Sequence, residues 1–465
     1  MTAVVTPGTA AGRTPPGPPR RAMFSLLRKL GSDRLGLMTE ARDEYGDAVR
    51  VVIGPKTLYI FNHPDHAKHV LADNASNYHK GIGYVEARKA LGDGLLTSEG
   101  ELWRKQRRTI QPVFQHKRVA AQAGLIASEA TQLVARLRKH IGGGPVDVLQ
   151  ELTGLTLGVL GQALLETDLS AFESVGHSFE AVQDQAMFEL ESMGMVPMWL
   201  PLPKQRSFRK ARKDLGRIVD LLVKDRVANP RADGSDVLSR LIVSTREEAD
   251  PKVGEQRMRD ELVTLLLAGH ETTASTLGWT LHLLDQHPEV QERLRAEAIA
   301  VLGDREPGYA DLEKLTYTSM VLQEAMRLYP PVWILTRNAQ GDDEIGGYHV
   351  PAGSDVLICP YTLHRHPAFW DAPDKFDPDR FDPSLPVSRP RYAYIPFGAG
   401  PRFCVGNHLG LLEATLVLVT LVRELRLESV PGREVVPEPM LSLRVRGGLP
   451  MTVHPAPEAE EHRGT

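Results

Sequence analysis

The stretch PFGAGPRFCVGNHLGLLEATLVL, residues 396–418, combines glycines, one of only two cysteines and a long apolar run. Glycine has no side chain, so the backbone there can turn tightly and approach a flat object closely. From about residue 407, leucine and valine recur at spacings of three and four, which predicts a helix. Cys404 then lies at or just before a helix N-terminus, where unpaired N–H groups and the helix dipole favour thiolate. Arg402 adds a positive charge close by, so the stretch predicts a site for an anionic sulfur ligand.

Two interpretations of this cysteine are open, because free cysteine is also one of the most buried residue types and often only structural. Six positions favour the ligand: they match Phe-Gly-x-Gly-x-Arg-x-Cys-x-Gly, the haem-binding signature of the cytochrome P450 family, which the sequence resembles here. The matching residues are Phe397, Gly398, Gly400, Arg402, Cys404 and Gly406. The resemblance implies that Cys404 is the axial ligand of a haem b iron, with the other residues of the signature around the cofactor.

The bulk composition restricts the classes of function. At 465 residues, the chain is expected to form two domains or one large, ligand-filled domain. Lys and Arg number 55 and Asp and Glu 59, a net charge of −4, which suggests neither nucleic acid nor an anionic membrane as a partner. If Cys404 binds a metal, Cys359 has no disulfide partner, which suits a reducing cytoplasm.

Both ends of the chain read as flexible tails. Residues 1–22 are rich in Pro, Gly, Ala and Thr, and residues 456–465 are polar. Neither contains an apolar signal region, and we expect no stretch long enough to span a bilayer and hence no transmembrane anchor. The family resemblance predicts a single P450 domain over residues 23–455.

The pattern between the tails predicts a mainly α protein with a minor β region. A helix is expected near Arg34–Tyr45, two strands within residues 48–62, mostly helices from 63 to about 327, and strand-like pieces within 348–361. Residues 440–455 read as a β-hairpin that turns at Gly447 and Gly448. The resemblance implies the cytochrome P450 fold, with the haem between a long central helix and the cysteine loop.

That central helix is predicted around DELVTLLLAGHETTASTLGWTLHLL, residues 260–284. A glycine, an acid and two hydroxyls in an apolar helix are locally unfavourable, which points to a functional site. The segment resembles the family's oxygen-binding motif, which implies that Thr272 binds dioxygen, that Glu271 relays protons and that Ala268 lies against the haem. A kinked core helix with satisfied polar groups is the alternative. His270 occupies the variable position of the motif and receives no catalytic role.

Glu324 and Arg327 are three residues apart, on one face of a helix. Alone they read as a common surface ion pair of low energy. In the family this Glu-x-x-Arg pair is buried, and Pro378–Phe381 resembles the segment that contributes a further arginine. The resemblance therefore implies a network of Glu324, Arg327 and Arg380 that serves folding and haem retention rather than chemistry.

Trp103 and Arg107 are four residues apart and hence on one helical face. In the family such a pair reaches a haem propionate, and arginine suits a carboxylate well. Alignment with the family adds Arg337 and Arg402 as the other propionate ligands. A solvated arginine on a strand is the alternative for Arg337.

The family reaction inserts one atom of O2 into a C–H or double bond and reduces the other to water. Electrons would come from NAD(P)H through a separate ferredoxin and its reductase, or through a flavodoxin, because the chain carries no fused flavin or iron–sulfur module. The expected pocket is mostly apolar, which indicates a lipophilic substrate such as a terpene, polyketide, steroid or fatty acyl compound. Besides Ala268 and Thr272, the family's layout gives as its lining Ile82, Tyr84, Val85, Met187, Phe188, Val332, Trp333, Ile334 and Leu449.

Two alternatives remain at this point. One is a haem-thiolate isomerase, dehydratase or peroxygenase that needs no redox partner. Such relatives commonly lack the acid–threonine pair that Glu271 and Thr272 form here. The other is a non-catalytic haem binder or sensor, which has no need of that pair either.

Overall fold

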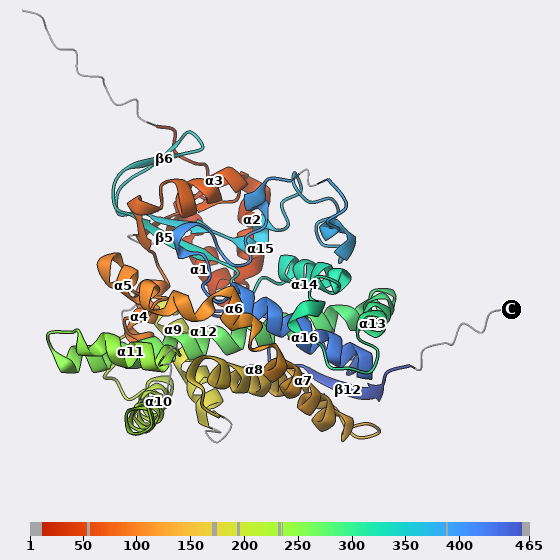
Figure 1. Cartoon of the computed structure of the whole chain (residues 1–465). Helices are drawn as coiled ribbons and strands as arrows, with labels where there is room; N and C mark the ends of the chain where they lie inside the picture. Colours follow the sequence, from red (N-terminus) through yellow and green to blue (C-terminus); the bar gives the residue numbers. More distant parts are fainter. Residues whose placement is uncertain are drawn as a thin grey trace, which may run out of the picture. The chain divides into compact units, whose positions relative to one another are not determined.

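The computed structural model describes residues 12–53, 56–169, 174–192, 196–230, 234, 236–386 and 389–457. The chain divides into two compact units, coloured along the sequence in Figure 1. Unit 1 comprises Met1–Ile82, Ile334–Pro373 and Arg389–Phe403, and unit 2 comprises Gly83–Trp333, Asp374–Ser388 and Cys404–Thr465. Each is described by itself, and a single domain over 23–455 stays a prediction.

Unit 1 is built on a five-stranded sheet. Its order is β1 (Ala48–Ile53), β2 (Lys56–Phe61), β8 (Asp355–Ile358), β5 (Leu335–Ala339) and β3 (Tyr78–Lys80). Only β2 and β8 run parallel, which requires a long connection between them. The strands within 48–62 and 348–361 were predicted, and the structure confirms them. A two-stranded hairpin, β6 (Asp343–Ile345) and β7 (Tyr348–Val350), completes the strands of the described part of unit 1.

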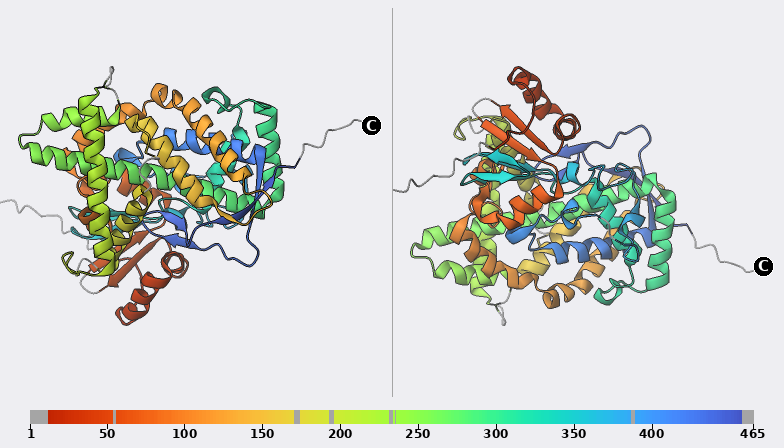
Figure 2. Two further views of the ribbon diagram at one scale, coloured as in Figure 1. Left: turned by 90° about the horizontal axis from the view of Figure 1, so that it is seen from below. Right: turned by 90° about the horizontal axis from the view of Figure 1, so that it is seen from above.

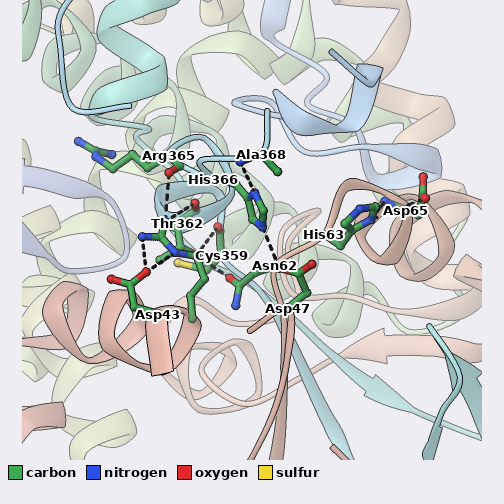
Figure 3. A network of polar contacts seen from close by, with 11 residues as sticks. Asp43, Asp47, Asn62, His63, Asp65, Cys359, Thr362, Arg365, His366 and Ala368 are labelled. Carbon is green, nitrogen blue, oxygen red and sulfur yellow. Dashed lines mark hydrogen bonds and ion pairs between the residues drawn. The ribbon is translucent and has the colours of Figure 1, made fainter. Parts of the chain in front are cut away.

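The helices of unit 1 are short. They are α1 (Met23–Ser32), α2 (Arg34–Tyr45), α3 (Pro64–Lys68) and α15 (Pro360–Leu363), with single turns at Arg20–Ala22, His69–Asp73, Ala75–Asn77, Arg391–Ala393 and Gly400–Arg402. The predicted helix over Arg34–Tyr45 is confirmed. Figure 3 shows how α15 and the residues after it are joined to the residues that flank β1 and β2. The Thr362 hydroxyl donates to Asn62 Oδ1 at 2.7 Å, and His366 Nε2 lies 2.8 Å from Asp47 Oδ1.

Part of the predicted N-terminal tail is ordered against unit 1. His349 N donates to Arg13 O at 3.0 Å and Arg50 N donates to Pro16 O at 2.8 Å. These bonds give the residues from Arg13 onward backbone partners on β7 and β1, so tail composition did not decide their structure. Residues 1–11 and 458–465 of the predicted tails lie outside the described residues.

Unit 2 is mainly helical. Its helices are α4 (Tyr84–Leu91), α5 (Gly100–Ile110), α6 (His116–Ala120), α7 (Ala123–Arg138), α8 (Val148–Leu165), α9 (Ser174–Glu191), α10 (Pro203–Ala228), α11 (Val237–Arg246), α12 (Pro251–Gln286), α13 (Pro288–Leu302), α14 (Thr316–Leu328) and α16 (Asn407–Glu424). Single turns occur at Gln111–Phe114, Tyr309–Asp311 and Pro378–Phe381. The long helix α10 packs along α9 (Figure 2).

The central helix of unit 2 is α12, as predicted. Asp250 caps it by accepting a hydrogen bond from Lys252 N, Pro251 begins it, and it continues without interruption to Gln286. It contacts α8, α11, α14 and α16 (Figure 1). Most of its side chains between Leu262 and Leu284 are buried, so this helix forms the centre of the apolar core.

The predicted hairpin at residues 440–455 is wrong. The turn residues Gly447 and Gly448 do have positive φ angles of 69° and 81°. However, β11 (Leu443–Val445) pairs with β10 (Pro437–Pro439), whereas β12 (Pro450–Pro455) pairs with β9 (Leu425–Ser429) and β4 (Val146–Asp147). The chain turns where the glycines allow it, but long-range pairing sends the two strands to different sheets.

One helix of the described chain is long and apolar enough to cross a membrane by length and composition alone. This helix is α8, whose mean hydropathy is 1.3. Within the protein, 56% of it is buried. The expectation that no stretch reaches this length is therefore wrong for α8. Its contacts with α7 and α12 are those of a core helix.

Candidate functional site

Cys404 lies three residues before α16, as predicted. The backbone N–H groups of Gly406 and Asn407 and the Arg107 guanidinium act to lower the pKa of its thiol. Burial outweighs them, and the pKa is raised above its usual value of 9.0. The helix N–H groups therefore lower the thiol pKa, as predicted. The net rise was not predicted, because burial depends on the whole fold.

The surroundings of Cys404 are unusual for a buried thiol. Its side chain is accessible to solvent, although burial dominates its pKa. On α12, Ala268 is likewise exposed, while Leu267 on one side of it is buried. Unit 2 thus presents an accessible sulfur and, in the middle of its central helix, an accessible small residue.

Arg107 and Trp103 lie on one face of α5, both half-buried, as their spacing predicted. Burial lowers the pKa of Arg107, and the charge of Cys404 raises it. The positive charge of Arg107 acts in turn to lower the pKa of the Cys404 thiol. A half-buried cation in this position is suited to an anionic ligand.

On α12, the polar residues of the predicted oxygen-binding motif divide between two stripes. The Thr272 hydroxyl donates to Ala268 O, one turn back, at 2.8 Å. Glu271 lies about 100° around the helix from it. Its carboxyl accepts hydrogen bonds from Ser442 Oγ at 2.6 Å and from Gln183 Nε2. The acid and the alcohol are therefore neighbours in sequence that bond to different parts of the protein.

The other residues of the motif serve packing. A Cβ on Gly269 would stand 2.7 Å from the methyl carbons of Leu160, so this glycine allows the close approach of α8 rather than of a ligand. His270 is buried, its Nδ1 lies 2.5 Å from Leu266 O, and its ring contacts Phe179. Burial lowers its pKa, so the ring stays neutral in the core.

The structure brings Glu324, Arg327 and Arg380 together. Arg327 Nε donates to Glu324 Oε2 at 2.6 Å, and a second nitrogen donates to Oε1 at 2.7 Å. Arg380 Nε lies 3.4 Å from Glu324 Oε1. Arg327 also donates to Lys375 O, and Asp377 N donates to Glu324, so the pair ties α14 to the loop at 375–377. The surface ion pair considered for the sequence is excluded, because both side chains are fully buried.

The predicted cofactor residues Arg337, Gly398 and Gly400 meet packing or backbone requirements within unit 1 itself. Arg337, on β5, is only 6% exposed and donates to Thr336 O, so it is not the solvated strand arginine of the alternative interpretation. Gly398 and Gly400 have φ angles of 71° and 66°. A Cβ on Gly400 would lie 1.8 Å from Leu71 O, so the group that approaches this backbone closely is another part of unit 1. The roles of Arg337, Arg402, Phe397 and Gly398 toward a cofactor stay predictions.

The residues predicted to line the substrate pocket have varied surroundings. Val85 on α4 is 54% exposed, whereas Met187 on α9 is almost fully buried. The Trp333 indole N–H donates to Met440 O at 2.9 Å, which fixes the ring in the interior. In unit 1, the Ile82 N–H donates to Asp355 Oδ1 and the Ile82 carbonyl accepts from the Thr336 hydroxyl. The structure does not test whether Tyr84, Phe188, Val332 and Ile334 meet a substrate.

Leu449 is not at the tip of a hairpin. Its N–H donates to Asp147 Oδ1 and its carbonyl accepts from Val148 N, and the side chain is buried in the core beside Gly278. These contacts give no support to its prediction as a pocket residue. The error follows from the wrong hairpin, which also concealed the segment that does reach Glu271.

Sequence reasoning missed that segment and its partner, Ser442 and Gln183. They are 259 residues apart in the chain and carry no motif, and only the fold brings them to one carboxyl. The local sequence around Ser442 offers one signal of a special role, which is a polar side chain between the apolar Leu441 and Leu443.

The residues of unit 2 fit a haem. A soft sulfur donor at a helix N-terminus, a half-buried guanidinium that affects its pKa and an exposed alanine on α12 are what a flat, dianionic, iron-containing group requires. Among the described residues there is no cluster of three or more His, Cys, Asp or Glu that could hold a metal ion. A metal at Cys404 would therefore depend on ligands that a cofactor brings.

Comparisons with known proteins agree with this geometry. The family model for cytochrome P450 matches residues 15–452. The chain is 38% identical to cyclooctatin synthase and 35% identical to cyclooctat-9-en-7-ol 5-monooxygenase, both from Streptomyces melanosporofaciens. Each alignment covers 88% of this chain and 89% of the relative. It is 32% identical to pentalenene oxygenase from Streptomyces avermitilis, over 84% of this chain and 87% of that protein.

Haem is the general cofactor of this family, held by a thiolate. The match spans both units, two of these relatives carry the names of oxygenases, and the alignments leave little of either protein uncovered. The chain belongs to the cytochrome P450 family and is a P450 monooxygenase.

Proposed function

We propose that this monooxygenase inserts one atom of O2 into a terpenoid, by hydroxylation or epoxidation. The observation that carries the proposal is the likeness, over most of both chains, to relatives whose names specify the oxidation of cyclooctat-9-en-7-ol and of pentalenene. The apolar character of Met187, Phe188 and Trp333 suits such a substrate. Electrons would come from NAD(P)H through a separate ferredoxin and reductase, or a flavodoxin, in the cytoplasm.

Haem b is the cofactor that we assign to the site, with Cys404 as the axial ligand. When bound, the haem supplies the iron at which dioxygen is activated. Arg107 and Trp103 would pair with one propionate, and Gly406 and Ala268 would lie against the ring. Arg337, Arg402, Phe397 and Gly398 are assigned to the cofactor by the family resemblance alone.

Thr272 and Glu271 are the proposed catalytic residues of the chain. The Thr272 hydroxyl donates to Ala268 O, and a rotation about one bond would redirect it toward a dioxygen molecule beside α12. Burial raises the pKa of Glu271 above its usual value, which favours the protonated form of this carboxyl and suits a group that gives and takes up a proton. The network of Glu324, Arg327 and Arg380 has a structural role in our proposal.

The test begins with the cofactor. The reduced, purified protein under carbon monoxide should show the red-shifted Soret band of a thiolate-bound haem. Cyclooctat-9-en-7-ol and pentalenene are then added separately, with NADPH, a surrogate ferredoxin, its reductase and ¹⁸O₂. The proposal predicts that one of them gains a single ¹⁸O atom for each NADPH consumed.

Three other results would favour the alternatives. A product formed from hydrogen peroxide without NADPH indicates a peroxygenase. A product of unchanged mass, or one that has lost water, indicates an isomerase or a dehydratase. Binding of haem without any turnover of a wider lipid library indicates a binder or sensor.

A further inference from the structure

The carboxyl group of Glu271 has a hydrogen-bond donor on each of its oxygens. Ser442 Oγ donates to Oε1 at 2.6 Å, and Gln183 Nε2 donates to Oε2. Ser442 directly precedes β11, and Gln183 lies on α9. Both donors are only 3% exposed, so water does not compete freely for these bonds. The position of the carboxyl is therefore fixed from two sides by segments distant in sequence.

Ser442 is itself fixed by α12. The Leu443 carbonyl accepts from Ser275 Oγ at 2.6 Å and from Trp279 Nε1 at 3.0 Å. Residues 271, 275 and 279 are spaced by four, so they form one stripe along the helix. The same stripe thus holds the backbone beside Ser442 and receives the Ser442 hydroxyl. The register of the segment 440–443 against α12 decides where Oε1 of Glu271 stands.

The second side of this segment is held as well. Leu443 N donates to Pro331 O at 2.8 Å, and the Trp333 indole donates to Met440 O at 2.9 Å. Residues 440 and 443 are therefore both anchored, with Ser442 between them. A serine on a backbone anchored at both ends loses little freedom when its hydroxyl bonds Glu271, which makes it an efficient positioning group.

Gln183 differs from Ser442 because its amide has two chemical ends. Among the described residues, its Oε1 is buried without a hydrogen-bond partner, so the bond to Glu271 alone orients the amide. When the carboxyl is ionised, Nε2 donates to it. When the carboxyl is protonated, a reversed amide presents Oε1 to accept its O–H. The amide can accompany either protonation state of Glu271.

Charged groups around the carboxyl act in opposite directions. Burial raises the pKa of Glu271, and the charge of Glu180 on α9 adds to that rise. The bonds from Ser442 and Gln183 and the charge of Arg444 on β11 oppose it. His270, next to it on α12, is itself shifted toward the neutral form. The two donors therefore favour the ionised form of a group that burial drives toward the acid.

We propose that Ser442 and Gln183 are positioning residues for Glu271, which hold its carboxyl on α12 in the place from which it exchanges a proton during turnover. The inference rests on the proposed role of Glu271 and deepens it, since neither residue touches the reacting atoms. Ser442 sets the position of Oε1, and Gln183 bonds Oε2 in either protonation state while favouring the ionised one.

The experiment compares Ser442→Ala with Ser275→Ala in the purified full-length protein. Each variant removes one buried serine hydroxyl from the contact between α12 and the segment 440–443. Only the Ser442 hydroxyl bonds the carboxyl of Glu271, whereas the Ser275 hydroxyl bonds Leu443 O. The first readout is the infrared carbonyl band of Glu271, assigned by its loss in Glu271→Gln and followed against pH. This titration needs no turnover. Ser442→Ala should raise the apparent pKa by about one unit, because a donor to the ionised form is lost. Ser275→Ala should shift it much less, because Trp279 Nε1 still donates to the Leu443 carbonyl.

The second readout is coupling in the oxygenase assay. Ser442→Ala should lower kcat several-fold with KM nearly unchanged and divert NADPH electrons to hydrogen peroxide, and Ser442→Thr, which keeps a hydroxyl, should restore both. Gln183→Leu should likewise raise the pKa of the carboxyl, whereas Gln183→Glu should raise it further, because it adds a like charge.

The proposal is overturned if Ser442→Ala leaves the band unmoved, or if Ser275→Ala shifts band and coupling equally, which is the mark of a general structural effect. Failure of the proposed function is distinguishable. A chain that oxidises no terpenoid still gives the band shift, and then only the substrate assignment is lost. A Glu271→Gln variant that keeps full coupling overturns the proton role, and with it the functional meaning of the positioning.

Discussion

Glu324 and Arg327 form a two-point ion pair one helical turn apart on α14, and neither side chain is exposed. We predict that Arg327→Met destabilises the protein by about 3–5 kcal/mol, because the Glu324 carboxylate is left buried without its main cation. Urea unfolding measures the change, and bound haem should fall with it. Arg293→Met removes the exposed ion pair to Asp379 and should cost less than about 1 kcal/mol. Equal losses in the two variants would contradict a special role for the buried pair.

Glu261, near the start of the buried part of α12, should make stability depend on pH. Burial raises its pKa to about 8, although Leu95 N donates to it. The folded state then holds a proton that the unfolded state releases near pH 4.5. The contribution of Glu261 to stability is therefore fully present below about pH 4.5 and declines as the pH rises from there to about 8. The slope from this group is at most about 1.4 kcal/mol per pH unit.

Glu261→Gln should remove that part of the slope, because the amide does not ionise. Urea unfolding at pH 6 and pH 8 in both proteins measures it, with the exposed Glu255→Gln as the matched control. A variant whose stability falls between these pH values as steeply as that of the unaltered protein would show that Glu261 is already ionised at pH 6.

Thr272 and Thr276 give a matched pair for the hydroxyl in the proposed oxygen site. Each donates to the carbonyl four residues earlier on α12, at 2.8 and 2.9 Å. Thr272→Ala should divert most of the NADPH electrons to hydrogen peroxide, because no hydroxyl remains beside Ala268 to bind dioxygen. Thr276→Ala removes the same kind of bond from a buried position and should leave product formation within about twofold. Peroxide and product assays against NADPH consumption decide between these outcomes.

Local features of this fold were predictable because they depend on residues close in sequence. Helix α16 begins at Asn407 and helix α2 spans Arg34–Tyr45, as the sequence pattern indicated. The spacing of Trp103 and Arg107 placed them on one face of α5, and the motif around Thr272 falls in the middle of the central helix.

What the sequence did not reveal depends on long-range packing. The chain does turn at Gly447 and Gly448, but the flanking strands do not pair with each other. Strand β11 pairs with β10, and β12 pairs with β9. Ser442 reaches Glu271 only because Ser275 and Trp279 fix its neighbour. The raised pKa of the Cys404 thiol, like that of Glu261, comes from burial, which no local motif states.

Lys89 on α4 and Glu189 on α9 form an ion pair of 3.0 Å, in which the carboxylate is fully buried and the ammonium half-exposed. Gln185 donates to the other oxygen of Glu189 at 2.8 Å. Lys89→Met should weaken the packing of α4 on α9 by about 1–3 kcal/mol, because a buried acceptor loses its charged donor. Hydrogen exchange of the α9 amides should accelerate accordingly. Arg88→Met, which removes the exposed pair to Asp93, serves as the control, and an equal acceleration there would refute the assignment.

The basic residues of α5 are not equivalent as a docking surface for an acidic electron carrier. Arg104 already pairs with Glu101, and Lys105 pairs with Glu247 and Glu248 at 3.5 and 3.0 Å. Arg108 is exposed on the same helix. If a ferredoxin docks here, a cation engaged by a neighbouring carboxylate attracts it less, so Arg108→Glu should slow reduction by the ferredoxin more than Arg104→Glu does.

The measurement is the rate of haem reduction against ferredoxin concentration at several salt concentrations. Docking by charge predicts that Arg108→Glu weakens the salt dependence and raises the half-saturating ferredoxin concentration, with the limiting rate little changed. Dithionite, which needs no docking, should reduce the variant and the unaltered protein alike. Because the proton exchange at Glu271 and the docking on α5 are separate steps, a docking variant should keep its coupling of NADPH to product even when turnover is slow.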